Sequence, residues 1–279
     1  MPDEIRPEDL DKAARQELKT LTKENADWVA RHLAMAARLI DTEPALAHRH
    51  AQAASRKAGR VGVVRETVGL TAYATGDFSL ALRELRTFRR ITGSNTQVPI
   101  MADCERALGR PHEALELARS VPLETLPVEV QVDLAIVKSG ARLDLGEDEE
   151  ALVELEIPQL DPNTAYRYSP RLYRAYAEVL SGMGRDEESA TWVARAEVAE
   201  ELFGIDADGN PLAQPEDDVE VVELPDVEYA DAEGEADTDA EEVVPVDANT
   251  EAATSVDADA NSDAEDPVGS DAGHQDVEK

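Results

Sequence analysis

A short unit that recurs along the chain is the feature that most constrains its fold. Each copy has a glycine, a short polar turn, and then Ala or Ser five residues after the glycine. The four copies read ATGDFSLALREL (74–85), ALGRPHEALELA (107–118), DLGEDEEALVEL (144–155) and GMGRDEESATWV (182–193). Their glycines, Gly76, Gly109, Gly146 and Gly184, are spaced by 33, 37 and 38 residues. Periods of this size indicate a stacked array of similar units.

The residues on either side of each turn have the spacing of an amphipathic helix. Val64, Val68 and Ala72 recur every four residues before Gly76, and the helical apolar spacing continues from residue 78 to residue 88. The glycine would end the first helix in a left-handed conformation that other residues resist, and the small residue after the turn lets the second helix approach closely. One hairpin cannot cover its own apolar face, so we expect neighbouring hairpins to stack.

This pattern resembles the tetratricopeptide repeat, including that of actinobacterial repeat proteins with an acidic tail. Segment 68–88, VGLTAYATGDFSLALRELRTF, places the motif residues of that family at Gly69, Gly76, Asp77, Phe78 and Ala81. The last copy matches with Tyr173 at the early aromatic position and Ala177 in place of the first glycine. The resemblance covers roughly residues 22–203. It implies an all-α fold: a right-handed superhelical array of antiparallel helix hairpins with a concave groove.

The periodicity predicts three regions and about five hairpins. A lead helix over 7–20 belongs to an N-terminal region 1–21, and the repeat domain spans 22–204. Ser169 and Pro170 predict a helix start with Ser169 as the N-cap. The hairpins are predicted at 22–40/43–58, 62–75/77–91, 95–108/111–120, 127–145/147–157 and 169–183/185–203, the first of them degenerate.

The last 75 residues differ in composition from the rest. Segment 205–279 contains 26 Asp and Glu residues and a single base, Lys279, in a chain whose formal net charge is −34. Such a segment cannot bury enough apolar surface to offset its chain entropy, and its charges repel one another. We therefore predict that 205–279 is a disordered acidic tail.

The sequence predicts a soluble, cytoplasmic protein that is a monomer or a weak oligomer. Cys104 is the only cysteine, so an intrachain disulfide cannot form. The start, MPDEIRPEDLDKAARQEL, is acidic and has no apolar core of a signal peptide. The longest uncharged run, ITGSNTQVPIMA (91–102), is too short and too polar to span a bilayer. No membrane association is expected.

The sequence contains no motif for catalysis, a cofactor or a metal. The motifs of phosphate-binding loops, dinucleotide-binding folds, zinc proteases and serine hydrolases are absent. Cys104 lies in a helical pattern without a base motif beside it, which favours a buried apolar role over a nucleophile. His48 and His50 are two residues apart, which places them on different faces of a helix, unsuited to one metal. We expect a non-enzyme.

Segment 166–176, YRYSPRLYRAY, is the favoured contact region because arginines alternate with tyrosines and acids are absent from it. The resemblance implies that Arg171 and Arg174 face the groove, while Tyr173 and Tyr176 pack between helices. Tyr166 and Arg167 precede the helix and are freer to contact a partner. The other positions that the resemblance directs to the groove are Tyr73 and Arg106, which we also take as candidate contacts, and Glu66, Asp103, Asp133, Asp144 and Glu178.

A second basic feature lies in 48–90, where nine bases face three acids. Arg83, Arg86 and Arg90 are spaced i, i+3, i+7 and form a stripe on one helix face. The stripe is either a solvated outer face or a contact for RNA phosphates. The main hypothesis is therefore a non-catalytic scaffold that binds a peptide or helix of another protein in the groove. The alternative is a factor that associates weakly with RNA or ribonucleoprotein through the stripe, with the acidic tail as competitor.

Overall fold

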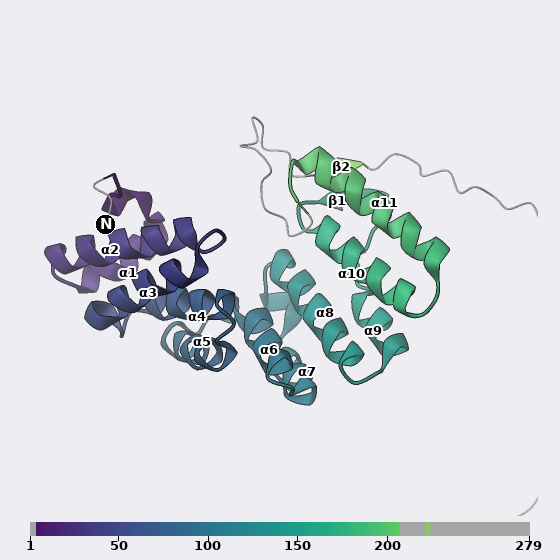
Figure 1. The fold of residues 1–279 in the computed structure, drawn as a ribbon, viewed down its shortest axis with the longest axis horizontal. Helices are drawn as coiled ribbons and strands as arrows, with labels where there is room; N and C mark the ends of the chain where they lie inside the picture. The colour runs from purple at the N-terminus through teal and green to yellow at the C-terminus, as the bar shows by residue number, and fades with distance from the viewer. Residues whose placement is uncertain (1–3, 207–220, 224–279) are drawn as a thin grey trace, which may run out of the picture. The chain divides into compact units, whose positions relative to one another are not determined.

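The computed structural model describes residues 4–206 and 221–223, and this part of the chain is almost entirely helical. It belongs to the first of two units, 1–229, whereas the second, 230–279, lies outside the described residues. In chain order the elements of Figure 1 are η1 (Pro7–Asp9), α1 (Lys12–Glu17), η2 (Leu18–Thr20), α2 (Lys23–Leu39), α3 (Pro44–Ala58), α4 (Gly62–Ala74), α5 (Phe78–Thr92), α6 (Val98–Ala107), α7 (Pro111–Arg119), η3 (Leu123–Thr125), α8 (Val128–Leu143), α9 (Asp148–Leu155), β1 (Thr164–Tyr166), α10 (Ser169–Gly182), α11 (Asp186–Phe203) and β2 (Val221–Glu223).

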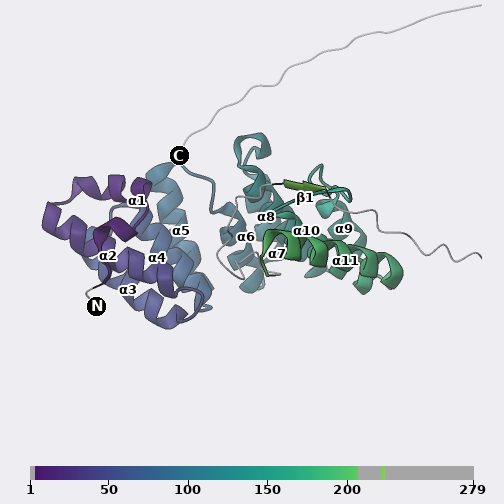
Figure 2. The same cartoon turned by 90° about the horizontal axis from the view of Figure 1, so that it is seen from above.

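The helices form five hairpins, as predicted. The pairs α2–α3, α4–α5, α6–α7, α8–α9 and α10–α11 each pack together, and Figure 1 and Figure 2 show the partners side by side. The second helix of each hairpin also packs against the first helix of the next one. The all-α array of antiparallel hairpins is therefore confirmed for the described residues.

The turn of each repeated unit is built as the sequence predicted. Gly76, Gly109, Gly146 and Gly184 have φ angles of 78°, 74°, 74° and 77°, in the left-handed region. At the first of these turns the backbone N–H groups of Gly76 and Asp77 donate to the carbonyls of Tyr73 and Ala72, both at 2.9 Å. The same pair of hydrogen bonds closes the other three turns, which is the Schellman arrangement that satisfies the last carbonyls of a helix.

Replacing Gly76 with Val is expected to lower the free energy of unfolding by about 1–2 kcal/mol, because a β-branched residue resists the left-handed conformation. A Cβ atom there would meet nothing within 4 Å, so the loss would come from the backbone alone. Urea unfolding of the full chain measures it. Gly76→Asn is the control and should lose less, since Asn tolerates positive φ better. An unchanged midpoint for the Val variant would contradict this account of the turn.

Small residues lie where the two helices of a hairpin cross. Ala81 on α5 is fully buried, and Gly69 on α4 leaves room for the side chain of Leu85. In the last copy Ser189 replaces the alanine, and its hydroxyl donates to the carbonyl of Ala177 at 2.7 Å. The buried polar atom is thereby satisfied, so the substitution keeps the close packing without an unpaired group.

Two local predictions were wrong. The predicted lead helix over 7–20 is divided into η1, α1 and η2, because Leu10 is extended and Asp11 caps α1 by accepting from the N–H groups of Ala13 and Ala14. Ser169 is the first residue of α10 and not its N-cap. Its hydroxyl instead accepts a hydrogen bond from the backbone N–H of Tyr166 at 3.0 Å, which ties β1 to the start of the helix.

A short antiparallel ribbon was not predicted. The strands β1 and β2 pair with Ala165 opposite Val222, so residues 221–223 of the predicted tail take part in the described fold. Ile205 is also 2 % exposed and packs with Phe203, one residue beyond the predicted domain boundary. The rest of the predicted disordered tail, 207–220 and 224–279, lies outside the described residues.

Candidate functional site

Four of the predicted groove residues line one hollow of about 270 Å³, here called the groove site. They are Tyr73, Asp103, Asp133 and Arg171, and they come from α4, α6, α8 and α10 respectively. Each of these helices is the first of its hairpin. Residues almost a hundred positions apart are therefore brought together by stacking of the hairpins, at positions that the resemblance had directed to the groove.

The remaining lining of the groove site is apolar, and the sequence analysis missed it. Pro99 and Ile100 lie on α6, and Ile136 and Val137 on α8. A signal was present, since Ile136 and Val137 follow Asp133 by three and four residues and must share its helix face. An apolar lining with a few fixed polar groups is the usual composition of a ligand-binding surface.

Arg106 joins two helices beside the groove site. Its guanidinium donates from Nη1 to Asp103 Oδ1 on its own helix and from Nε to Asp144 Oδ2 after α8, both at 2.8 Å. The hydroxyl of Tyr73 donates to the other oxygen of Asp103 at 2.5 Å. Burial, followed by the bond to Asp103, raises the pKa of Tyr73. Burial alone would lower the pKa of Arg106, but the two carboxylates outweigh it and raise that pKa. Arg106 is thus a fixed cation.

Gly140 on α8 makes room for this arginine. A Cβ atom at Gly140 would lie 2.5 Å from the Arg106 Cζ atom and 2.6 Å from Nη1. The guanidinium therefore lies directly against the backbone of α8, and a larger residue at this position would displace it. In this position Arg106 also contacts Asp144.

Arg171 closes the other side of the groove site. Its Nε atom lies 2.8 Å from Asp133 Oδ1, an ion pair that links α10 to α8. Burial raises the pKa of Asp133, and the charge of Arg171 opposes this only in part. The Asp133 side chain is half-buried, and a carboxylate whose desolvation is offset only in part gains from a further cation. Asp133 is therefore suited to meet a positive group of a ligand.

The other predicted contact residues lie elsewhere. Arg174 is held by Glu200 of α11, with Nε–Oε1 at 2.5 Å and Nη2–Oε2 at 2.7 Å, and does not line the groove site. Tyr166 and Arg167 lie at β1 and before α10, also outside that lining. Tyr166 is 38 % exposed, and its ring stacks on that of Tyr168. Tyr173 and Tyr176 are buried, as the resemblance implied.

Cys104, His48 and His50 are each accounted for by packing or by a neighbouring side chain. Cys104 is fully buried, and burial raises the pKa of its thiol to about 12, so it stays protonated. His48 points to Thr71 on α4, with Nδ1–Oγ1 at 2.9 Å, whereas His50 meets His32 on α2. The two histidines therefore diverge, as expected. Within 4–206 and 221–223, no group of three His, Cys, Asp or Glu residues could hold a metal ion.

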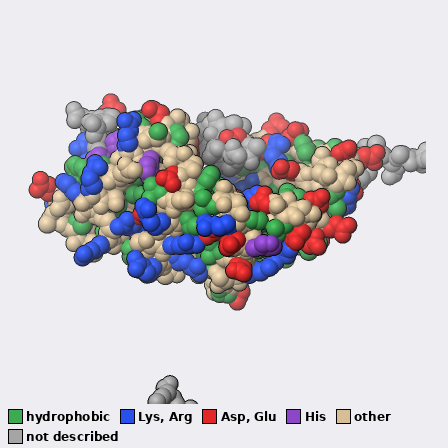
Figure 3. All heavy atoms as spheres, turned by 60° about the horizontal axis from the view of Figure 1, so that its bottom comes forward, with side chains coloured by type: hydrophobic (Ala, Val, Ile, Leu, Met, Phe, Trp, Pro, Cys, Tyr) green, Lys and Arg blue, Asp and Glu red, His purple; other side chains and the backbone are tan. Residues whose placement is uncertain are grey.

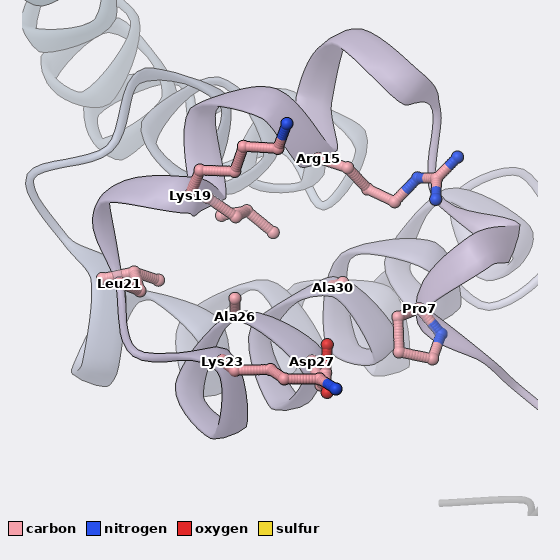
Figure 4. A pocket seen from close by; sticks show the side chains of 9 residues that line it. Pro7, Arg15, Lys19, Leu21, Lys23, Ala26, Asp27 and Ala30 are labelled. Carbon is pink, nitrogen blue, oxygen red and sulfur yellow. The ribbon is translucent and has the colours of Figure 1, made fainter.

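A further hollow of about 320 Å³ lies between the lead segment and α2 (Figure 4). Arg15 and Lys19 come from α1 and η2, which form the lead segment, and Ala26 and Ala30 from α2. The side chains of Lys19 and Lys23 form no ion pair within the described part of the chain. The lysines of this hollow are thus not fixed by ion pairs, in contrast to Arg171 and Asp133 of the groove site, and we assign the hollow no function.

Comparison with known proteins adds little to this geometry. No protein-family model matches the chain, and no curated protein matches it. A solved structure titled "MamA MSR-1 C2" aligns with a TM-score of 0.30 and 17% identity, over 66% of this chain and 84% of that one. A superposition this loose carries no argument. Among the described helices, none combines the length and apolar character needed to cross a membrane.

Proposed function

We propose that the protein is a non-catalytic scaffold of the tetratricopeptide repeat type, whose groove site binds a peptide or helix of a partner protein. One observation carries this proposal: α4, α6, α8 and α10 together line a single hollow. Its lining combines apolar side chains with polar side chains that hydrogen bonds and ion pairs hold in place. A side chain of a partner could be buried against Ile100 and Ile136, with its flanking residues facing the ion pairs.

The charges of the groove site indicate the chemistry of the partner. Within and beside the groove site, three carboxylates, Asp103, Asp133 and Asp144, pair with two guanidiniums, Arg106 and Arg171. The carboxylates outnumber the guanidiniums, so the local charge disfavours an acidic peptide. The best fit is an apolar anchor residue flanked by Lys or Arg, which would pair with the half-buried Asp133.

RNA association, the alternative from the sequence, has less support. Arg83 and Arg86 of the basic stripe contact the buried carboxylates of Glu84 and Glu105. The charge that remains is gathered in one hollow with Arg90 and Arg110, whereas a nucleic acid backbone is bound through many phosphate contacts along its length. We therefore do not propose RNA binding as a second function, and the experiments below include an RNA probe that tests it.

Panning of a random peptide display library on the immobilised full chain tests the proposal. We expect enriched peptides to carry an apolar residue next to Lys or Arg. Ile136→Lys should weaken their binding about tenfold or more, since it removes an apolar contact and adds a repelling charge. Val153→Lys is the matched control, because Val153 lies on α9 and is 65 % exposed, and it should leave binding unchanged.

A second variant tests the charge preference separately. Asp133→Asn should keep the apolar selection but remove the preference for Lys or Arg. Thermal unfolding followed by circular dichroism shows whether each variant folds. If folded Ile136→Lys binds the selected peptides as well as the parent chain does, the groove site is not the binding surface.

A further inference from the structure

A second concave surface lies on the second-helix side of the array. The arginine hollow, about 500 Å³ in volume, is lined by Arg83, Arg86 and Arg90 of α5, by Arg110 before α7, and by the apolar Leu82 and Leu108. Figure 3 shows Lys and Arg side chains gathered over the N-terminal helices of this face, with Asp and Glu more frequent toward the C-terminal helices. The surface is separate from the groove site, which the first helices form.

Two buried glutamates hold the arginines from below. Glu105 contacts two of them, with Oε1 2.5 Å from Arg86 Nη2 and Oε2 2.6 Å from Arg110 Nη2. Glu84 likewise contacts Arg83 at 3.2 Å and also Arg65. The side chain of Glu105 is 4 % exposed, whereas that of Arg86 is 59 % exposed. The carboxylates therefore lie beneath the surface, and the guanidiniums that they contact face the solvent.

The cations of the hollow exceed the acids that hold them. Four arginines line it, Glu105 neutralises one charge, and Glu84 is shared with Arg65. Arg90 forms no ion pair with the described residues. Each guanidinium has five N–H donors, and the contacts to Glu84 and Glu105 use only some of them. Because the glutamates already order Arg83, Arg86 and Arg110, a ligand would not have to order them on binding.

We propose that the arginine hollow binds a phosphate group, carried as a monoester on a partner peptide or present as free phosphate. A phosphate monoester has about two negative charges near neutral pH and three acceptor oxygens, which match converging guanidinium forks. A single carboxylate offers half that charge. The volume suits one phosphate with the residue that carries it, and the cations form a compact group and not a track for a long polymer.

Titration calorimetry with the full chain tests the proposal, using inorganic phosphate, pyrophosphate and a peptide with one phosphoserine as probes. The unphosphorylated peptide serves as the reference. We expect the phosphopeptide to bind and the Arg90→Gln variant to bind it about tenfold more weakly, since a charge-assisted hydrogen bond is lost. Arg89→Gln is the matched control: it removes the same charge from α5, but Arg89 donates to Asn95 and does not line the hollow. It should change affinity less than about twofold.

The measured affinities distinguish free phosphate from phosphate carried on a partner peptide. Equal affinity for inorganic phosphate and the phosphopeptide assigns the hollow to the free ion, whereas a clear preference for the phosphopeptide assigns it to a modified partner. Equal binding of phosphorylated and unphosphorylated peptide would overturn the proposal. So would equal losses for Arg90→Gln and Arg89→Gln, or a single-stranded RNA that binds far more tightly than either phosphate probe. Arg86→Gln with unaltered unfolding gives a second check, and retained affinity there would also contradict the proposal.

Discussion

Replacing Gly69 with Leu is expected to lower the free energy of unfolding by about 2–3 kcal/mol, the upper range for overpacking a filled core. A Cβ atom at Gly69 would lie 2.6 Å from Leu85 Cδ2 and 2.7 Å from Leu85 Cγ, which no change of the terminal methyl groups alone can relieve. Leu85 is fully buried and cannot turn outward. The helices α4 and α5 would have to separate, and α5 also packs on α6. The loss should therefore spread beyond one hairpin.

Gly182→Leu is the matched control for this variant. Gly182 also lies on the first helix of a hairpin, but a Cβ atom there meets nothing within 4 Å. Leu has a higher helix propensity than Gly, by roughly 0.8 kcal/mol, so this control should be neutral or stabilising. Urea unfolding of both full-length variants measures the difference. If Gly69→Leu were as stable as the parent chain, the close crossing of α4 and α5 would be incorrect.

Acidification from about pH 6.5 to about pH 4 is expected to destabilise the first hairpin through its histidines. The Nδ1 atoms of His32 and His50 lie 3.0 Å apart, so one ring must donate and the other accept. Trp28 also lies against His32, with ring centroids 4.1 Å apart. Burial, followed by the charge of His50 and by Arg56 and Arg31, lowers the pKa of His32 to about 4. Burial also lowers the pKa values of His50 and His48.

The direction of the effect follows from these lowered pKa values. The unfolded chain takes up protons on its histidines near pH 6.5, whereas the folded chain resists them until the pH is about 4 at His32. The contribution to stability is therefore complete above pH 6.5 and is lost as the pH falls toward 4. Because the His32 ring is only half-buried, solvent screening should limit its share to about 1–2 kcal/mol.

Urea unfolding over this pH range, compared between variants, isolates the histidines from the acidic residues that titrate below them. The His32→Gln/His50→Gln double variant should lose less stability on acidification than the parent chain, since neutral amides replace the titrating pair. His112→Gln, at an exposed position on α7, is the control and should follow the parent profile. Parallel profiles for the parent and the double variant would refute the proposed coupling.

The groove site could be predicted in part because its residues lie on the first helices of successive hairpins, at positions that the resemblance directs to the groove. Tyr73, Asp103, Asp133 and Arg171 share one hollow once the hairpins stack in register. Arg174 could not be placed in this way, because its orientation depends on Glu200, 26 residues further along on α11. Likewise the stripe of Arg83, Arg86 and Arg90 was predicted as a helix face, but the glutamates beneath it belong to tertiary packing.

The sequence by itself determined the hairpins, their order and their turns, because these depend on local properties. A glycine at φ near 75° and apolar residues at helical spacing act within a few residues of one another, so Gly76 and its equivalents could be identified directly. Only the tertiary structure decided which charges are paired, how Gly140 accommodates Arg106, and that 221–223 pair with β1. These features join segments distant along the chain, and their energies depend on burial and distance, which no local pattern records.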